Sequence, residues 1–150
     1  MQSHNTFRHG RGFTLVEIVV VLAIFGLLVG LGLFMSMDAY RGFNFRSERD
    51  VVVSELQRAR SHAMANRYGK AWGVCYIAPD YIVFRGTACV AGASTNELLS
   101  AAPSVTITGL NPPGVVFSQL SGATTATTIQ ITQDNRTTTV SINHEGTINW

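Results

Sequence analysis

The chain is poor in charge and in the side chains on which enzymes and metal sites depend. Only 13% of its 150 residues are Asp, Glu, Lys or Arg, against about 25% in a typical soluble domain. It has two cysteines and four histidines, and it contains neither a phosphate-binding glycine-rich loop nor a GxGxxG pattern. These shortages predict a protein that is not an enzyme, has no catalytic residues and binds neither a metal nor a cofactor. Its length is that of about one domain.

What the chain has instead is one long apolar run. Between residues 12 and 37 the only charged side chain is Glu17, and residues 18–37 are all apolar apart from three glycines and one serine. Twenty residues of helix rise about 30 Å, the thickness of a bilayer's hydrocarbon core, whereas the apolar part of a signal peptide has about 7–15 residues. The sequence therefore predicts a single membrane span. Arg8 and Arg11 precede it, which predicts that the N-terminal end stays in the cytoplasm.

The acidic residue at the start of this run is unusual for a plain anchor. A charged side chain within a bilayer costs roughly 2.5–3.5 kcal/mol, and such a residue usually has a partner. A short basic segment ends in Gly12, and Phe13-Thr14-Leu15-Val16-Glu17 and the apolar run follow it. This pattern resembles the prepilin signature of type IV pilins and type II secretion pseudopilins.

The resemblance implies that the chain is processed and assembled. Residues 1–12 are expected to be a leader that a prepilin peptidase removes after Gly12, and the new amino group of Phe13 is expected to be N-methylated. The Glu17 carboxylate would pair with the amino terminus of a neighbouring subunit, which would offset its charge in an apolar filament core. The expected location is the inner (cytoplasmic) membrane, crossed once, with the C-terminal head in the periplasm or outside the cell.

The second half of the predicted helix, residues 38–68, is amphipathic. An apolar stripe repeats at i, i+4, i+7 and i+11 along one face, and it is expected to pack on a sheet. The stripe consists of Val52, Leu56, Ala59 and Ala63, with Met64 beside it. The helix is predicted to run from near Thr14 to near Arg67, with Gly69 as the C′ residue that ends it.

Several arginines lie away from this stripe and admit two interpretations. They are Arg49, Arg58, Arg60 and Arg67. The first interpretation is a solvated face with pairs within the helix, such as Asp50 with Ser54 or Glu55 with Arg58. The second is contact with DNA phosphates.

From residue 69 the hydrophobic period becomes two and β-branched residues dominate. Seven strands are predicted, over residues 71–77, 81–85, 104–108, 115–119, 127–133, 137–143 and 147–150. Residues 86–102 and 121–126 are expected to be loops. Ile129 and Ile131 alternate with polar residues, so one sheet face is expected to be buried.

The predicted fold class is α+β and type IV pilin-like. A long N-terminal α-helix is expected to be transmembrane in its first half, residues 13–37, and amphipathic in its second half. That second half is expected to pack on an antiparallel β-sheet head formed by residues 69–150.

The two cysteines, Cys75 and Cys89, both lie in the expected head. In a domain outside the cytoplasm such a pair predicts a disulfide, which would close a loop of about 15 residues and stabilise the fold by roughly 3 kcal/mol. Two buried thiols are the alternative. His62 and His144 are the only histidines beyond the leader. Neither has a recognisable catalytic spacing, and His144 is expected in a turn.

Two further segments narrow the resemblance. Residues 55–67, which lead into the first strand, and residues 143–146 near the end of the chain are similar to the GspH/FimT group of minor pseudopilins and minor pilins. This implies a low-abundance subunit that helps to initiate or cap a type II secretion pseudopilus or a type IV pilus. The implied partners are other pilin or pseudopilin subunits, the prepilin peptidase and the inner-membrane assembly platform.

Two other functions fit part of the pattern. A DNA-binding minor pilin of a DNA-uptake pilus would need several cations on one surface. Residues 71–150 carry only Arg85 and Arg136 against four acidic residues, so nucleic acid is disfavoured as a partner. An uncleaved bitopic membrane protein with a β-rich sensor head is the other alternative, and it would need neither the cleavage site nor Glu17.

Overall fold

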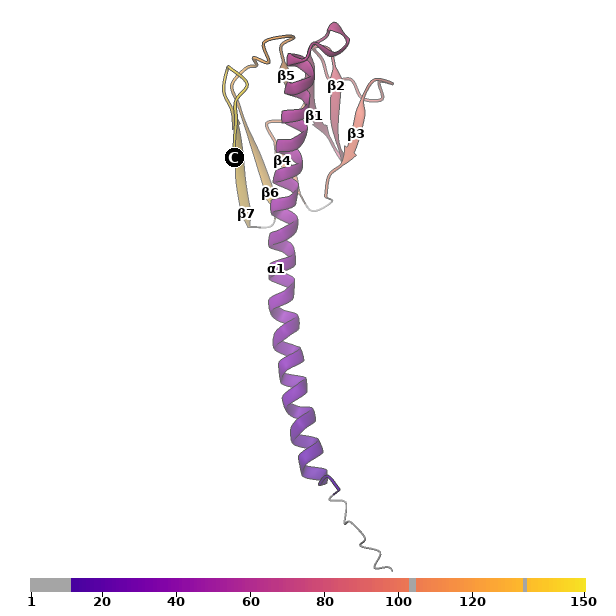
Figure 1. Cartoon of the computed structure of the whole chain (residues 1–150), viewed down its shortest axis with the longest axis vertical. Helices are drawn as coiled ribbons and strands as arrows, with labels where there is room; N and C mark the ends of the chain where they lie inside the picture. The colour runs from indigo at the N-terminus through magenta and orange to yellow at the C-terminus, as the bar shows by residue number, and fades with distance from the viewer. Residues whose placement is uncertain (1–11, 103–104, 134) are drawn as a thin grey trace, which may run out of the picture. The chain divides into compact units, whose positions relative to one another are not determined.

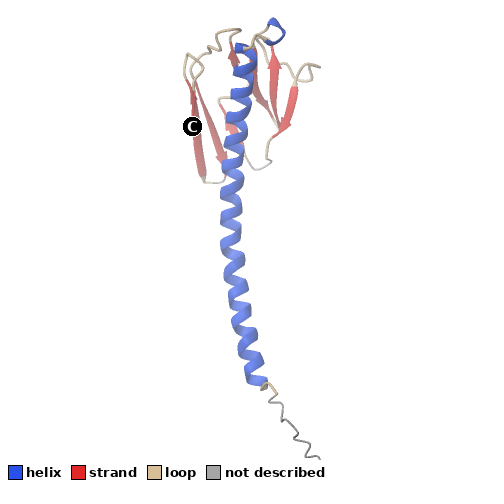
Figure 2. Cartoon of the chain, viewed as in Figure 1, coloured by secondary structure: helices blue, strands red, loops and turns tan. Residues whose placement is uncertain are grey.

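The computed structural model describes residues 12–102, 105–133 and 135–150, and their side chains except those of residues 33–41. It contains a helix, α1 (Leu15–Met64), and a short 3-10 turn, η1 (Arg67–Gly69) (Figure 1; Figure 2). The strands are β1 (Trp72–Ile77), β2 (Asp80–Arg85), β3 (Glu97–Ser100), β4 (Thr106–Thr108), β5 (Val115–Phe117), β6 (Thr127–Gln133), β7 (Arg136–Ile142) and β8 (Ile148–Asn149). The chain divides into two units between Arg41 and Gly42.

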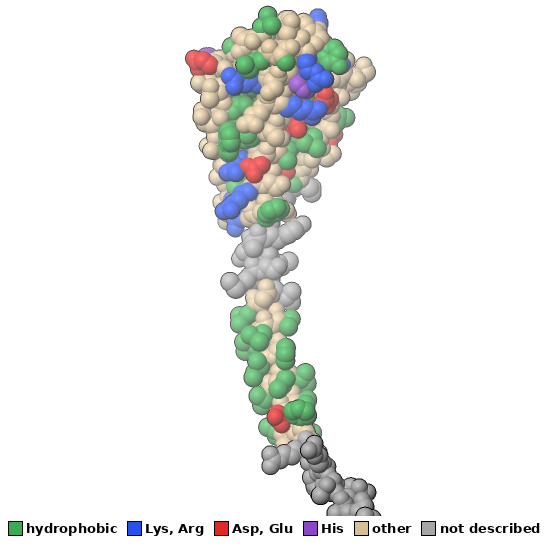
Figure 3. Space-filling model, viewed as in Figure 1, with side chains coloured by type: hydrophobic (Ala, Val, Ile, Leu, Met, Phe, Trp, Pro, Cys, Tyr) green, Lys and Arg blue, Asp and Glu red, His purple; other side chains and the backbone are tan. Residues whose placement is uncertain are grey.

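The N-terminal unit, Met1–Arg41, contains the apolar part of α1. Its stretch Leu15–Gly32 is 18 residues long, has a mean hydropathy of 2.7 and has no buried residue. Figure 3 shows hydrophobic side chains on this surface. Residues 19–21 are consecutive valines, which are weak helix formers in water. In a bilayer, however, a helix satisfies every backbone polar group within the segment. By length and composition this helix can cross a membrane.

The strands of the C-terminal unit form two antiparallel sheets of four strands each. The first has the order β3-β2-β1-β5 and the second the order β4-β6-β7-β8. The sequence prediction did not divide the strands between sheets. It was also wrong about part of the expected loop 86–102, because β3 lies within it and pairs with β2 from Asp80 opposite Ser100 to Val83 opposite Glu97. The expected loop 121–126 contains no strand.

One hydrophobic core joins the end of α1 to both sheets. In Figure 1 this part of α1 lies across the two sheets, between β1–β3 on one side and β6–β7 on the other. The core side chains come from α1 (Val52, Val53, Leu56, Ala59, Ala63), the first sheet (Trp72, Val74, Tyr81, Val83, Val115, Phe117) and the second sheet (Ile107, Ile129, Ile131, Val140, Ile142, Ile148). The predicted stripe of Val52, Leu56, Ala59 and Ala63 and the predicted alternation in β6 are therefore confirmed, whereas Met64 is 48% exposed.

The outer face of the first sheet has a small core of its own. Cys75, Ile82 and Phe84 are buried there, with Cys89 packed against them. Gly73 lies opposite Phe84 in the register of β1 and β2. A Cβ at Gly73 would lie 2.5 Å from the Phe84 ring, so the glycine makes room for this ring. The segment that carries Cys89 thus contributes to a hydrophobic cluster that is separate from the main core.

The helix ends three residues earlier than predicted, at Met64. Asn66 adopts a left-handed conformation with φ 52°, a role that asparagine fills at some helix ends. The Ala63 carbonyl accepts a hydrogen bond from Asn66 N at 3.1 Å and a second one from Leu120 N at 2.9 Å. The segment after β5 therefore supplies a hydrogen-bond donor to a backbone carbonyl in the last turn of α1. Gly69, the residue expected to end the helix, lies in η1 instead.

Candidate functional site

The residues that precede α1 form a compact helix start. Thr14 Oγ1 accepts a hydrogen bond from Glu17 N at 3.3 Å, which makes Thr14 the N-cap. Thr14 and Glu17 have the spacing of a capping box, and an acidic residue in the first turn interacts favourably with the helix dipole. Sequence analysis assigned Glu17 only an assembly role. The T-x-x-E spacing was the signal that also indicates a local one.

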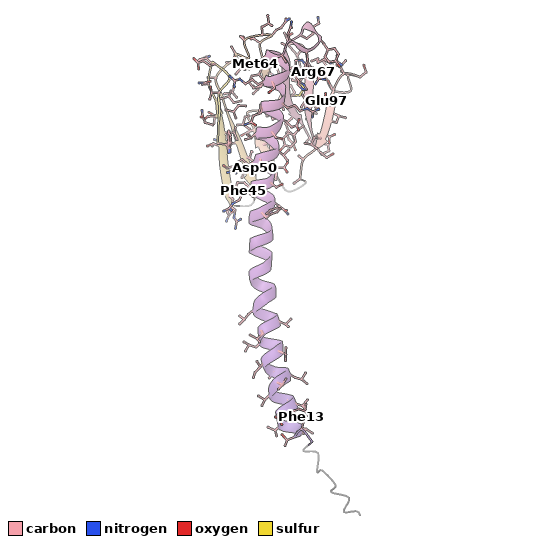
Figure 4. The ribbon with its side chains drawn as sticks, viewed as in Figure 1. Phe13, Phe45, Asp50, Met64, Arg67 and Glu97 are labelled. Carbon is pink, nitrogen blue, oxygen red and sulfur yellow. A yellow bond between two sulfur atoms is a disulfide. The ribbon has the colours of Figure 1, made fainter. Side chains whose placement is uncertain are left out.

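This helix start is open to its surroundings. Phe13 is 79% exposed, and nothing lies within 4 Å of a Cβ built at Gly12. Figure 4 labels Phe13 at the beginning of the helix. Glu17 is exposed among apolar side chains of α1. Among the described residues, the arrangement offers open space beside Gly12, an exposed Phe13 and a carboxylate without a cation beside it.

A second carboxylate, Glu48, is buried in the C-terminal unit and was missed from the sequence. It is 7% exposed, and its Oε1 accepts hydrogen bonds from Tyr81 Oη at 2.8 Å and from Ala102 N at 3.2 Å. Burial, followed by the hydrogen bond and the charge of Glu48, raises the pKa of Tyr81. Glu48 lies four residues before Val52 on the apolar stripe, and an acid at a core-facing position was the available signal. It joins α1 to β2 and to the segment after β3.

His62 is held in a basic and aromatic setting. Arg67 Nη1 lies 2.8 Å from His62 Nε2, and because a guanidinium can only donate, this nitrogen accepts. The ring meets Trp72 edge-on at 4.5 Å between centroids. Burial, followed by the charges of Arg67 and Arg58, lowers the pKa of His62. The environment favours a neutral ring that packs against β1.

The arginines of α1 are partly engaged within the protein. Arg58 pairs with Glu55 at 3.4 Å, as predicted, and also with Glu97 of β3. In Figure 4, Glu97 is labelled beside α1, on the side where the first sheet lies. The expected pair of Asp50 with Ser54 is wrong: Asp50 accepts from Arg49, and the Ser54 hydroxyl donates to the Val51 carbonyl.

Cys75 of β1 and Cys89 are joined by a disulfide, with their Cα atoms 6.4 Å apart. This confirms the predicted bond and excludes two free thiols. Within the described ranges, no group of three or more His, Cys, Asp or Glu side chains could hold a metal ion.

Two family models match the chain. The prokaryotic N-terminal methylation motif matches residues 7–33, which include the helix start described above. The model of type II transport protein GspH matches residues 50–146, well over half of the chain. The chain belongs to the GspH family. The resemblance to type IV pilin-like proteins of the GspH type is thereby confirmed.

The GspH region contains the disulfide, the apolar stripe and every strand of the two sheets except β8, so it covers most of the C-terminal unit. Among solved structures, the chain is similar to the minor pseudopilin EpsH from the Type 2 Secretion System of Vibrio cholerae. The two are 14% identical, with a TM-score of 0.50, over 69% of this chain and 91% of that one. The likeness confirms the α+β pilin fold. No curated protein matches the sequence.

Proposed function

We propose that this GspH-family chain is a minor pseudopilin of a type II secretion system that helps to initiate or cap its pseudopilus. One observation carries the proposal: the methylation motif over residues 7–33 contains the unburied apolar stretch Leu15–Gly32, in a chain whose residues 50–146 are a GspH region. The similar structure, EpsH, is a minor pseudopilin. An apolar surface of this length needs lipid or neighbouring apolar helices around it.

The proposed maturation removes residues 1–12 and methylates the amino group of Phe13. The exposure of Phe13 and the free space around Gly12 support cleavage there, because a peptidase must reach the peptide bond between them. Thr14 caps the helix, so the cleaved chain would keep a defined helix start one residue after its new terminus.

In the assembled state, the Glu17 carboxylate is proposed to pair with the amino terminus of a neighbouring subunit. Burial among apolar helices would desolvate Glu17, and a positive charge beside it would offset that cost. The described residues provide no cation beside Glu17, which supports a partner from another molecule.

The C-terminal unit is proposed to lie on the non-cytoplasmic side of the inner membrane. The disulfide between Cys75 and Cys89 supports this, because disulfides persist in oxidising compartments and are rare in the cytosol. The mature chain would remain anchored there until the assembly platform incorporates it with other subunits.

The test is co-expression of the chain with an active or an inactive prepilin peptidase, followed by intact mass and N-terminal sequencing. We expect loss of residues 1–12 and one added methyl group on Phe13 only with the active enzyme. A second test is Glu17→Gln, which we expect to leave cleavage intact but to reduce incorporation into filaments. An intact Met1 start with active peptidase would contradict the proposal and leave an uncleaved bitopic protein.

A further inference from the structure

An aromatic ring and two cations line one hollow in the C-terminal unit, at the end where α1 stops. Tyr68 of η1, Lys70, Arg85 at the end of β2, and Thr95 border this open hollow of about 360 Å³. Antiparallel pairing places Arg85 opposite Trp72, the first residue of β1. The hairpin therefore brings the lysine before β1 and the arginine at the end of β2 to one place. We call Tyr68, Lys70 and Arg85 the Tyr68 site.

The ring of Tyr68 is held outward from a strained backbone. Tyr68 has a φ of 58°, a left-handed conformation that is uncommon for residues with a Cβ, and it is 65% exposed. The Arg85 guanidinium lies over its ring, 4.1 Å from the centroid. Figure 4 labels Arg67, the residue before Tyr68, at this end of the unit. Neither the strain nor the exposed ring stabilises the fold, and backbone strain of this kind is concentrated at binding sites.

The positive charge of the Tyr68 site is not neutralised within the described structure. Lys70 and Arg85 form no ion pair with any other described residue. Glu97, which follows the lining residues closely in the chain, is engaged by Arg58 of α1, and the same arginine also pairs with Glu55. The hollow therefore keeps both charges of its own lining, and a ligand with carboxylates would complement it.

The lining favours a carboxylate over a nucleic acid. A guanidinium binds a carboxylate through paired hydrogen bonds, and an ammonium adds a point charge. A nucleic acid strand would need several cations along its backbone and open aromatic faces for its bases. Two cations line this hollow, and one of them, Arg85, already covers a face of Tyr68. A volume of about 360 Å³ lies at the lower end of the range for ligand sites, about 300–1,000 Å³, so it suits a few side chains of a peptide.

We propose that the Tyr68 site binds an acidic peptide segment of a partner protein. A carboxylate of the segment lies between Lys70 and Arg85, and an apolar side chain beside it packs on the exposed part of the Tyr68 ring. Tyrosine and arginine are enriched among the residues that dominate the energetics of protein interfaces. The site lies wholly within the C-terminal unit, so its occupation needs neither cleavage nor methylation. It is a docking contact in addition to the packing of apolar helices in the proposed function.

The test selects binders from a random-sequence peptide library on the immobilised full chain in an uncharged detergent. We expect the selected peptides to be enriched in Asp and Glu next to an apolar residue. Fluorescence anisotropy of one selected peptide, labelled with an uncharged dye, then gives its Kd. The Kd should rise about tenfold in Lys70→Gln/Arg85→Gln. It should also rise with salt, because exposed charge pairs are screened.

The matched control removes two cations at the opposite end of the unit. Arg46→Gln/Arg136→Gln alters a hollow in which the Arg136 guanidinium lies against Gly42, and it should bind the peptide with the Kd of the parent chain. Lys70→Glu leaves Arg85 over the Tyr68 ring and should reverse the selection, away from acidic peptides. This variant tests the charge requirement even if the loss of Arg85 disturbs the hairpin.

Four results would overturn the inference. The first is a library that yields no binder to the parent chain, and the second is a set of binders without enrichment in Asp and Glu. The third is an equal Kd for Lys70→Gln/Arg85→Gln and the matched control. The fourth is displacement of the selected peptide by single-stranded DNA at equal concentration, which would indicate a nucleic-acid site.

Discussion

Two glutamates of α1 have opposite environments. Glu17 is exposed among apolar side chains, whereas Glu48 is buried and accepts two hydrogen bonds. A buried carboxylate is tolerated when donors replace the lost water, and Tyr81 is the only side chain that does so for Glu48 among the described residues. The hydrogen bond between Glu48 and Tyr81 is therefore a point at which the helix is fastened to the first sheet.

The substitution Tyr81→Phe tests this contact. At pH 7 we expect it to lower the free energy of unfolding by about 1.5–3 kcal/mol, because a hydrogen bond to a charged acceptor is lost and Glu48 stays buried. The raised pKa of Tyr81 keeps its hydroxyl protonated in the folded state while the unfolded state ionises above its ordinary value of 10.0. The parent chain should therefore lose stability as the pH rises above that value, and the difference from Tyr81→Phe should shrink.

Urea unfolding at pH 7 and at several values above pH 10 measures both effects. Tyr76→Phe is the control, because Tyr76 packs beside Tyr81 with ring centroids 5.3 Å apart but is not bonded to Glu48 in the described structure. A difference between parent and Tyr81→Phe that is independent of pH would show that the Tyr81 hydroxyl does not carry the effect.

Leu120, which lies beside the C-terminal end of α1, has a strained backbone with a φ of 66°. Its N–H donates a hydrogen bond to the Ala63 carbonyl, and the residue is 64% exposed. A left-handed conformation costs about 1–2 kcal/mol for a residue with a Cβ. We expect Leu120→Gly to raise the free energy of unfolding by about 0.5–1 kcal/mol. Leu120→Ala removes the exposed side chain but keeps the strain, so thermal unfolding should show no comparable gain for it.

Among the elements, β1 and β2 of the first sheet are largely buried on both faces. One face packs on α1, and the other is covered by the cluster of Cys75, Ile82 and Phe84 with Cys89. The disulfide ties the segment after β2 to this outer face. Because the segment has few other buried side chains, its position depends on that bond.

Removal of the disulfide should therefore destabilise this element and the fold. For Cys75→Ala/Cys89→Ala we expect a loss of about 3 kcal/mol, the value for a closed loop of about 15 residues. The parent chain treated with a reductant is the matched comparison and should lose a similar amount. Chemical denaturation measures the stability, and limited proteolysis should cut residues 86–96 faster in both. Equal stability with and without the bond would contradict the assigned role.

At the scale of the whole molecule, the two units differ in whether their apolar residues are buried. The C-terminal unit buries its apolar residues against one another, and its core runs from Val52 to Ile148. The N-terminal unit leaves its apolar stretch Leu15–Gly32 unburied. The core that stabilises the fold therefore contains no residue from the apolar stretch Leu15–Gly32.

This separation predicts that a fragment of residues 42–150 folds by itself. We expect its free energy of unfolding to be within about 1 kcal/mol of that of the full chain in detergent, because distant and uncoupled segments contribute independently. Circular dichroism and urea unfolding of both proteins provide the measurement. A fragment without a cooperative transition would show that the apolar half of α1 contributes to the core.

Patterns that repeat over a few residues were read correctly from the sequence. Spacing by three and four identified the stripe that contains Leu56, and alternation identified the strand that contains Ile129. The edge strand β3 was missed because Leu98 and Leu99 are both exposed and do not alternate. Glu48 was missed because the periodicity of apolar residues does not report an acid at a core position.

The sequence by itself determined the apolar span, the methylation motif with Glu17, and the amphipathic continuation of the helix, because each depends on neighbours along the chain. Only the tertiary structure decided how the strands divide between two sheets, where the helix ends and that Arg136 meets Gly42. Those features depend on hydrogen bonds and packing between segments far apart in the sequence. A local pattern holds no information about which distant segment supplies the partner.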